Sequence, residues 1–94
     1  LEPACCTKIS PSMKISTNTP AAIAARRSVL EFLLINHPLD CPVCDKSGAC
    51  DLQDIIMECG KDTADFTEAK RVYPGADFGP LIKTEMSRCI QCMK

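Results

Sequence analysis

The sequence has few aromatic residues and little material for a large core. Its 94 residues include no Trp, one Tyr and three Phe, and a domain of this size buries only a limited share of its surface. The apolar run at residues 32–35 is far shorter than the roughly 20 residues of a membrane-spanning helix. Residues 1–15 also lack the charged and apolar regions of a secretory signal. These absences argue against a membrane span and a secretory signal.

The sequence has no excess of charge of either sign. It contains 11 basic and 12 acidic residues, intermixed along the chain, for a net charge of -1. A protein that follows a phosphate backbone usually carries a basic patch or stripe. Nucleic acid is therefore not an expected partner. The chain begins with Leu1 rather than Met, and we expect it to be an internal piece of a longer protein.

Cysteine is abundant where other core material is scarce, with eight Cys and one His in the chain. Residues 37–50 combine that His with three Cys, and two of these form a C-x2-C pair that a tight turn can present to one inorganic centre. Pro38 and Pro42 each restrict the backbone φ angle, and Ser47-Gly48 supplies a flexible turn before the last Cys. The candidate ligands are His37, Cys41, Cys44 and Cys50.

Three interpretations of this set stay open from the residues alone: a [4Fe-4S] cluster, a structural Cys3His zinc site, and disulfides. Zinc sites more often separate two ligand pairs by a longer loop, and the lone His, together with the absent signal, disfavours disulfides. The short spacing of the four candidate ligands in the sequence favours the cluster. Since a full ligand set leaves no iron open to substrate, the predicted role is electron transfer.

The other cysteines form incomplete sets. Cys89 and Cys92 make half a ligand set near the end of the chain, which fits a cluster, a redox dithiol or half a zinc site equally well. Cys5 or Cys6 could be the last ligand of a cluster whose other ligands lie upstream. Cys59, on the apolar face of an expected helix, is predicted to be a small core residue.

The pattern predicts a small α+β fold, with two helices and a few short strands in loops that wrap around the cluster. The first helix begins after a Thr19 cap with Pro20 at its first position and ends near residue 35 or 36, because Pro38 disfavours helical dihedrals before it. The second begins at an Asp51 cap and ends at Gly60. Other expected elements are strands at 13–17 and 81–86 and a type II turn at 73–75. The expected apolar faces comprise Ile23, Leu30, Leu33 or Leu34 in the first helix and Leu52, Ile55, Ile56 and Cys59 in the second.

These motifs together resemble the N-terminal region of the large iron-sulfur subunit of respiratory complex I, NADH:ubiquinone oxidoreductase. The resemblance extends over nearly the whole chain, and its most specific part is the signature from residue 37 to residue 50. Further matching stretches are 3–5, 16–18, 31–34, 50–54, 79–84 and 88–92. The same His-Cys signature occurs in iron-only hydrogenases and NAD-dependent formate dehydrogenases, but the stretches 79–84 and 88–92 favour complex I, and its mitochondrial type in particular.

The resemblance implies a role for each ligand group. The central four become the ligands of the His-ligated [4Fe-4S] cluster. Cys5 becomes the last ligand of a plant-ferredoxin-like [2Fe-2S] cluster shared with upstream sequence. Cys89 and Cys92 become the first two ligands of a second [4Fe-4S] cluster shared with downstream sequence. Cys6 and Cys59 have no counterpart as ligands.

The resemblance also implies an organisation and partners. Residues 1–18 would end a [2Fe-2S] domain, 19–78 would form the His/Cys-ligated [4Fe-4S] domain, and 79–94 would begin a second [4Fe-4S] ferredoxin-like domain, within a larger ferredoxin-like iron-sulfur region. The expected partners are the flavin-bearing NADH-oxidising subunit, other complex I subunits and the remainder of the same subunit. The expected location is the matrix side of the mitochondrial inner membrane, or the cytoplasmic side of a bacterial plasma membrane. An alternative function of a different class is that of a structural zinc module that mediates protein assembly.

Overall fold

Two helices supply most of the regular structure in the computed structural model, which describes residues 1–92. Short 3-10 helices and a two-stranded antiparallel sheet complete it, so the predicted small α+β fold class is confirmed. In chain order the elements are α1 (Pro20–Leu34), η1 (Cys41–Val43), α2 (Asp51–Cys59), β1 (Ala76–Asp77), β2 (Lys83–Thr84) and η2 (Met86–Arg88).

The start of α1 follows the sequence prediction. Thr19 is extended at the N-cap, and its hydroxyl oxygen accepts a hydrogen bond from the backbone N–H of Ala22 at 3.2 Å. Pro20 occupies the first turn, where a missing N–H costs nothing. The helix ends at Leu34, slightly earlier than predicted, and the N–H of Ile35 bonds back to the carbonyl of Phe32. This tightening of the last turn precedes Pro38 by several residues.

The start of α2 differs from the prediction by one residue. Cys50, rather than Asp51, is the N-cap, with extended dihedrals of φ -114° and ψ 109°. Its carbonyl accepts the first helical hydrogen bond, from the N–H of Asp54 at 3.1 Å, which makes Asp51 the first helical residue. Gly60 ends the helix as predicted, and its N–H bonds to the carbonyl of Ile56.

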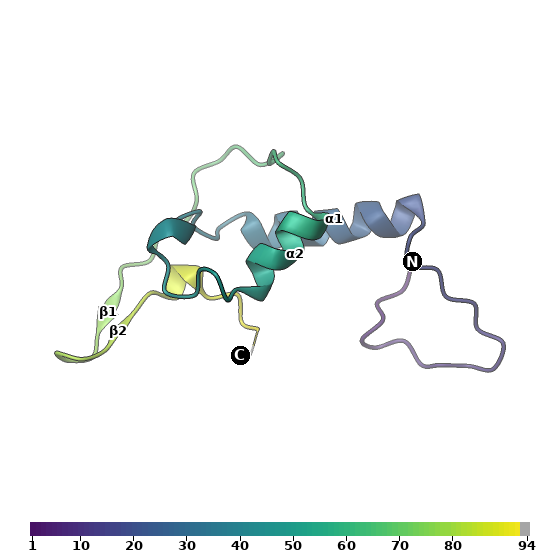
Figure 1. Cartoon of the computed structure of the whole chain (residues 1–94), viewed down its shortest axis with the longest axis horizontal. Coiled ribbons are helices and arrows are strands. Elements are labelled where there is room, and N and C mark those ends of the chain that lie inside the picture. The colour runs from purple at the N-terminus through teal and green to yellow at the C-terminus, as the bar shows by residue number, and fades with distance from the viewer. Residues whose placement is uncertain (93–94) are drawn as a thin grey trace.

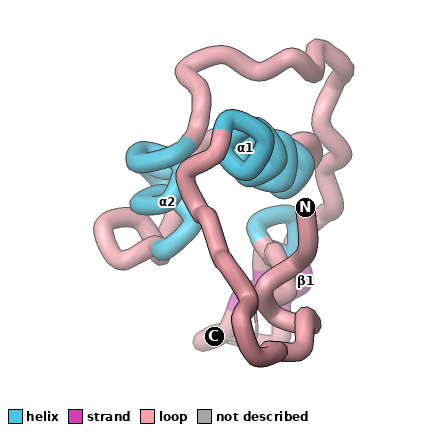
Figure 2. The backbone as a smooth tube through the Cα atoms, turned by 90° about the vertical axis from the view of Figure 1, so that its right-hand side faces the viewer, coloured by secondary structure: helices cyan, strands magenta, loops and turns pink. Residues whose placement is uncertain are grey.

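The core lies between α1 and α2, which cross side by side in Figures 1 and 2. Leu30 and Leu52 are buried, each with 7% of its surface exposed. Each predicted apolar face also has an exposed member, since Ile23 in α1 is 36% and Ile55 in α2 is 44% exposed. The prediction of the helix faces is therefore right for Leu30 and Leu52 and wrong for Ile23 and Ile55.

Residues 61–71 arch over α1 (Figure 1). Polar contacts attach them to α1 and to the residues just beyond its C-terminal end. The backbone N–H of Asp65 donates to the Glu31 carboxylate, and the N–H of Arg71 donates to the side-chain oxygen of Asn36 at 3.2 Å. Acceptors on α1 and just beyond its C-terminal end therefore hold the backbone of this segment in place.

The hairpin corrects two predictions. β1 and β2 pair Ala76 with Thr84 and Asp77 with Lys83, so the predicted strand at 81–86 shortens to two residues. The predicted turn at 73–75 is absent, and the chain reverses at residues 78–82, where Gly79 has φ +105°. Gly75 has a different role, because a Cβ there would lie 3.0 Å from the Thr84 carbonyl oxygen. Its missing side chain permits the two backbones to approach.

The predicted strand at 13–17 is wrong, since this segment is irregular. A short strand needs a partner to satisfy its backbone groups, and no described segment pairs with it. Instead, residues 1–19 form an open loop beyond the N-terminal end of α1, while the hairpin lies at the opposite end of an elongated molecule of 58 × 29 × 22 Å (Figure 1). No helix within residues 1–92 has the length and apolarity to cross a membrane.

Candidate metal centre

The C-terminal end of α1 delivers the candidate ligand loop. Helix ends leave carbonyl groups without partners and favour positive charge. The ammonium group of Lys70 meets both needs, since it donates to the carbonyls of Leu34, at 2.5 Å, and Ile35, at 3.5 Å. This cap fixes the direction in which the chain leaves α1 toward His37.

His37 sits in an environment that suits metal binding. It is half-buried, and its Nδ1 atom is buried without a hydrogen-bond partner among the described residues. Burial lowers the pKa of the imidazole, Lys70 and Arg88 lower it further, and Asp40 partly opposes them. The shift favours the neutral ring, which is the form that binds metals. A buried nitrogen with no protein partner therefore fits an inorganic group.

Two tight turns follow and space the three thiols. The 3-10 helix η1 holds Cys41 and Cys44 together, since the N–H of Cys44 donates to the carbonyl of Cys41 at 3.2 Å. The N–H of Ser47 then donates to the Cys44 carbonyl at 3.0 Å, and Gly48 takes φ +82°, a conformation that favours glycine. The chain reaches Cys50 at the N-terminus of α2, where free N–H groups stabilise negative charge.

The four candidate ligands thus share one loop between the two helices, but their side chains do not close around a point. Cys41, Cys44 and Cys50 are half-buried free thiols. Within residues 1–92, no three His, Cys, Asp or Glu side chains are gathered closely enough to hold a metal ion. A [4Fe-4S] cube places each ligand on a different iron, so its ligands need wider spacing than those of a single ion. The ligand assignment stays a prediction.

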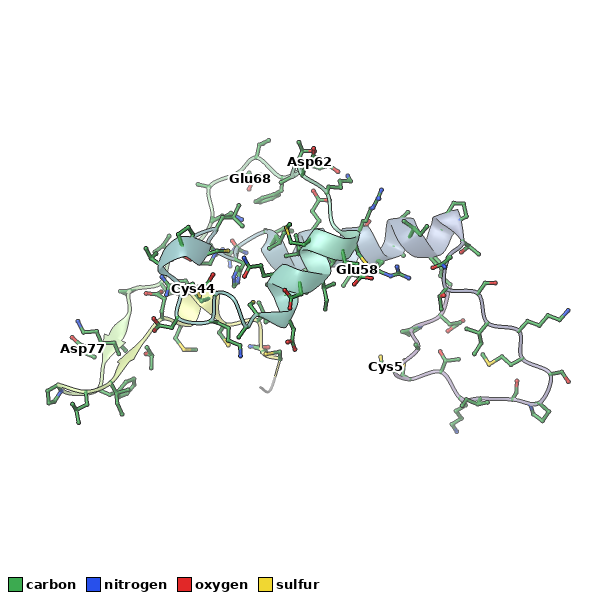
Figure 3. All side chains as sticks on the ribbon, in the orientation of Figure 1. Cys5, Cys44, Glu58, Asp62, Glu68 and Asp77 are labelled. Carbon is green, nitrogen blue, oxygen red and sulfur yellow. The ribbon has the colours of Figure 1, made fainter. Side chains whose placement is uncertain are left out.

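The remaining candidate ligands lie at two different places. Cys5 is exposed in the N-terminal loop, far from Cys44 along the length of the molecule (Figure 3). Cys89 and Cys92 are exposed after η2, which packs beside the ligand loop. A hollow of about 300 Å³ has both His37 and Cys89 in its wall. The C-terminal cysteine pair is therefore a neighbour of the central set, and Cys5 is not.

An ion pair that the sequence reasoning missed joins these two neighbours. The Oδ2 atom of Asp40 accepts hydrogen bonds from Arg88, from Nε at 3.1 Å and from Nη2 at 2.5 Å. The guanidinium lowers the pKa of Asp40 through this bond. The only signal in the sequence is positional: each residue directly precedes a candidate cysteine ligand, and the two have opposite charge.

A known family model matches the part of the chain that contains this loop. The model describes the NADH-ubiquinone oxidoreductase-G iron-sulfur binding region, and it covers residues 26–64. That range includes the second half of α1, the whole ligand loop and α2. All four central candidate ligands fall inside it, and Cys5, Cys89 and Cys92 fall outside.

Curated relatives match almost the full length of the chain. NADH dehydrogenase (ubiquinone) iron-sulfur protein 1, mitochondrial, of Solanum tuberosum is 56% identical over 90 residues, which is 96% of this chain and 12% of the relative. The NADH-ubiquinone oxidoreductase 75 kDa subunit of Reclinomonas americana is 53% identical, and an NADH-quinone oxidoreductase subunit of Rickettsia prowazekii is 54% identical, each over 96% of this chain and 13% of the relative. The chain thus spans about an eighth of the length of these relatives.

Proposed function

Because the chain belongs to the family of large iron-sulfur subunits of NADH:ubiquinone oxidoreductase, we propose that it is an electron relay in that enzyme. The observation that carries the proposal is the family match over residues 26–64, since it encloses the complete set of one imidazole and three thiols. The proposed path runs from NADH and flavin toward quinone. The matched model and relatives favour this assignment over the hydrogenase, formate dehydrogenase and zinc-module alternatives.

The residues proposed to hold the central [4Fe-4S] cluster are His37, Cys41, Cys44 and Cys50. When bound, such a cluster accepts and donates one electron at a time. The chain supplies the environment: η1 and the following turn space the thiols, and burial keeps the imidazole neutral. A neutral ligand leaves the site about one charge less negative than four thiolates would, which favours the reduced state.

We extend the proposal to the incomplete sets and the domain division. Cys5 would complete a [2Fe-2S] cluster of a domain that ends near residue 18, and Cys89 and Cys92 would begin a second [4Fe-4S] cluster in a domain that starts near residue 79. Residues 19–78 would then form the unit between them. The separation of Cys5 from Cys44, and the closeness of Cys89 to His37, support two different electron-transfer neighbours.

The proposed partners are the flavin-bearing NADH-oxidising subunit, other subunits of the enzyme and the rest of the same iron-sulfur subunit. The proposed location is the matrix side of the mitochondrial inner membrane or the cytoplasmic side of a bacterial plasma membrane, since relatives of both kinds match the chain. The proposal assigns this chain no residue that converts substrate.

The test is a redox titration of the assembled enzyme, followed by electron paramagnetic resonance. His37→Ala removes the imidazole from one proposed ligand set only, so the signal of one cluster should be lost or altered while the others keep their potentials. Cys59→Ala is the matched control, because Cys59 is half-buried on α2 and outside every proposed ligand set. An unchanged spectrum in the His37 variant would contradict the assignment.

A further inference from the structure

The Asp40–Arg88 ion pair differs from an ordinary surface pair. Arg88 reaches one carboxylate oxygen with two nitrogens, Nε and Nη2, and the side chains are only 25% (Arg88) and 36% (Asp40) exposed. Lys83 and Asp77 in the hairpin show the ordinary case, at 3.9 Å with side chains 84% and 67% exposed. Forked contacts from Arg fix geometry as well as charge, so the first pair is a defined structural link.

The position of the link is specific. Asp40 caps η1 and directly precedes Cys41, while Arg88 ends η2 and directly precedes Cys89. The pair therefore joins two cysteine turns that lie 48 residues apart in sequence. Figure 3 shows the end of η2 beside the loop of the labelled Cys44.

Both charges of the pair lie next to the central donors. Asp40 directly precedes Cys41, and the two neighbours of Arg88, Ser87 and Cys89, line the same hollow as His37. Because Arg88 holds the Asp40 carboxylate with two hydrogen bonds, each charge of the pair balances the other at this place.

We propose that Asp40 and Arg88 are positioning residues that hold the central and C-terminal ligand sets together and keep the charge beside the central set balanced. The inference rests on the proposed function, because it concerns the redox behaviour of the group on the central set. Net charge near an iron-sulfur centre helps to set its reduction potential. Loss of one partner leaves the other as an uncompensated charge beside His37.

The experiment measures midpoint potentials in the assembled enzyme by redox titration with electron paramagnetic resonance. Asp40→Asn leaves Arg88 unbalanced, so the potential of the central cluster should shift in the positive direction. Arg88→Gln leaves Asp40 unbalanced, so the same potential should shift in the negative direction. The matched controls, Lys83→Gln and Asp77→Asn in the exposed hairpin pair, should leave the potential in place.

Opposite signs are the decisive result, since a loosened structure alone gives no reason for them. Shifts of the same sign, or no shift in either variant, would overturn the inference and leave the proposed function standing. If no signal of the parent enzyme changes when His37 is replaced by Ala, that result would instead overturn the proposed function.

A reversed pair covers the case in which the single variants do not assemble. Asp40→Arg combined with Arg88→Asp restores an ion pair of the same net charge at the same place. Assembly with a potential near that of the parent would support the link. The proposed link would be overturned if the double variant did not assemble. It would also be overturned if the midpoint potential of the double variant equalled that of either single variant.

Discussion

At the scale of single residues, the features that matter most lie where α1 passes into the ligand loop. His37 is half-buried, its Nδ1 has no hydrogen-bond partner among the described residues, and its pKa is lowered chiefly by burial. Lys70 caps the helix just before it. Since a neutral imidazole adds no charge to a metal group, this residue distinguishes the central set from an all-cysteine set.

Replacement of that imidazole by a thiolate gives the first prediction. His37→Cys should keep a four-ligand set but add about one negative charge, which favours the oxidised state. The midpoint potential of the proposed central cluster should therefore shift in the negative direction in a redox titration of the assembled enzyme. A positive shift, with the cluster content intact, would show that the neutral ligand does not set the potential in this way.

Lys70 gives the second prediction at this scale. Lys70→Met removes the ammonium from the last carbonyls of α1 and should weaken the end of the helix by about 1 kcal/mol. Hydrogen exchange should become faster at the backbone amides of residues 33–36. Lys61→Met is the matched control, because among residues 1–92 the ammonium of Lys61 hydrogen-bonds to the exposed Asp65 carboxylate, at 2.7 Å, and to no carbonyl of α1. Equal exchange in both variants would exclude a capping role for Lys70.

At the scale of elements, local signals predicted the helices well and the strands poorly. The Thr19-Pro20 start and the Gly60 stop act within a few residues, so the chain itself specifies them. The segment 13–17 has a strand-like alternation, but a strand exists only with a partner. The turn at 73–75 failed for a related reason, since Gly75 serves a close approach to Thr84 rather than a reversal of the chain.

The candidate site likewise contains features that local sequence predicts and one that it does not. The central candidate ligands can be proposed from the sequence because they fall within one loop, and the structure places that loop between α1 and α2. The link between Asp40 and Arg88 joins residues 48 apart, and only the packing of η2 beside η1 brings them together. The positions of the two residues before candidate cysteines are a weak signal, and they do not predict that the two side chains meet.

The helix pair gives a prediction at this scale. Leu30 is 7% exposed on α1, which packs against α2, so Leu30→Ala should reduce the local stability of the helix pair by roughly 2–4 kcal/mol. Val29 is 60% exposed on the same helix, and Val29→Ala should have little effect. Hydrogen exchange of the α1 and α2 amides in the assembled enzyme compares the two. Similar protection in both variants would mean that the helix contact contributes little.

At the scale of the whole molecule, buried apolar surface is scarce. Among the described residues only Leu30 and Leu52 are buried hydrophobic side chains, and large apolar residues such as Phe32 and Leu81 are exposed at 72% and 94%. Small domains with thin cores commonly rely on a metal or on neighbouring domains. The elongated shape, with the ligand loop held between its two ends, agrees with a segment that is stabilised by what it binds.

This shortage of core predicts that metal and stability are coupled. Removal of iron from the protein with a chelator under oxidising conditions should increase hydrogen exchange in residues 37–50 and in α2, whose first residue follows the proposed ligand Cys50. Anaerobic reconstitution with iron and sulfide should restore protection. Protection that does not change on removal of iron would show that the helices and neighbouring segments hold the loop without metal.

The content of iron, acid-labile sulfide and zinc in the anaerobically purified protein distinguishes an electron relay from a structural site. The parent is compared with a variant in which Cys41, Cys44 and Cys50 are all replaced by Ser. The variant should lose about four iron and four sulfide per chain, as expected for one cubane cluster. A loss of about one zinc, with sulfide unchanged, would contradict the electron relay and assign the loop a structural role.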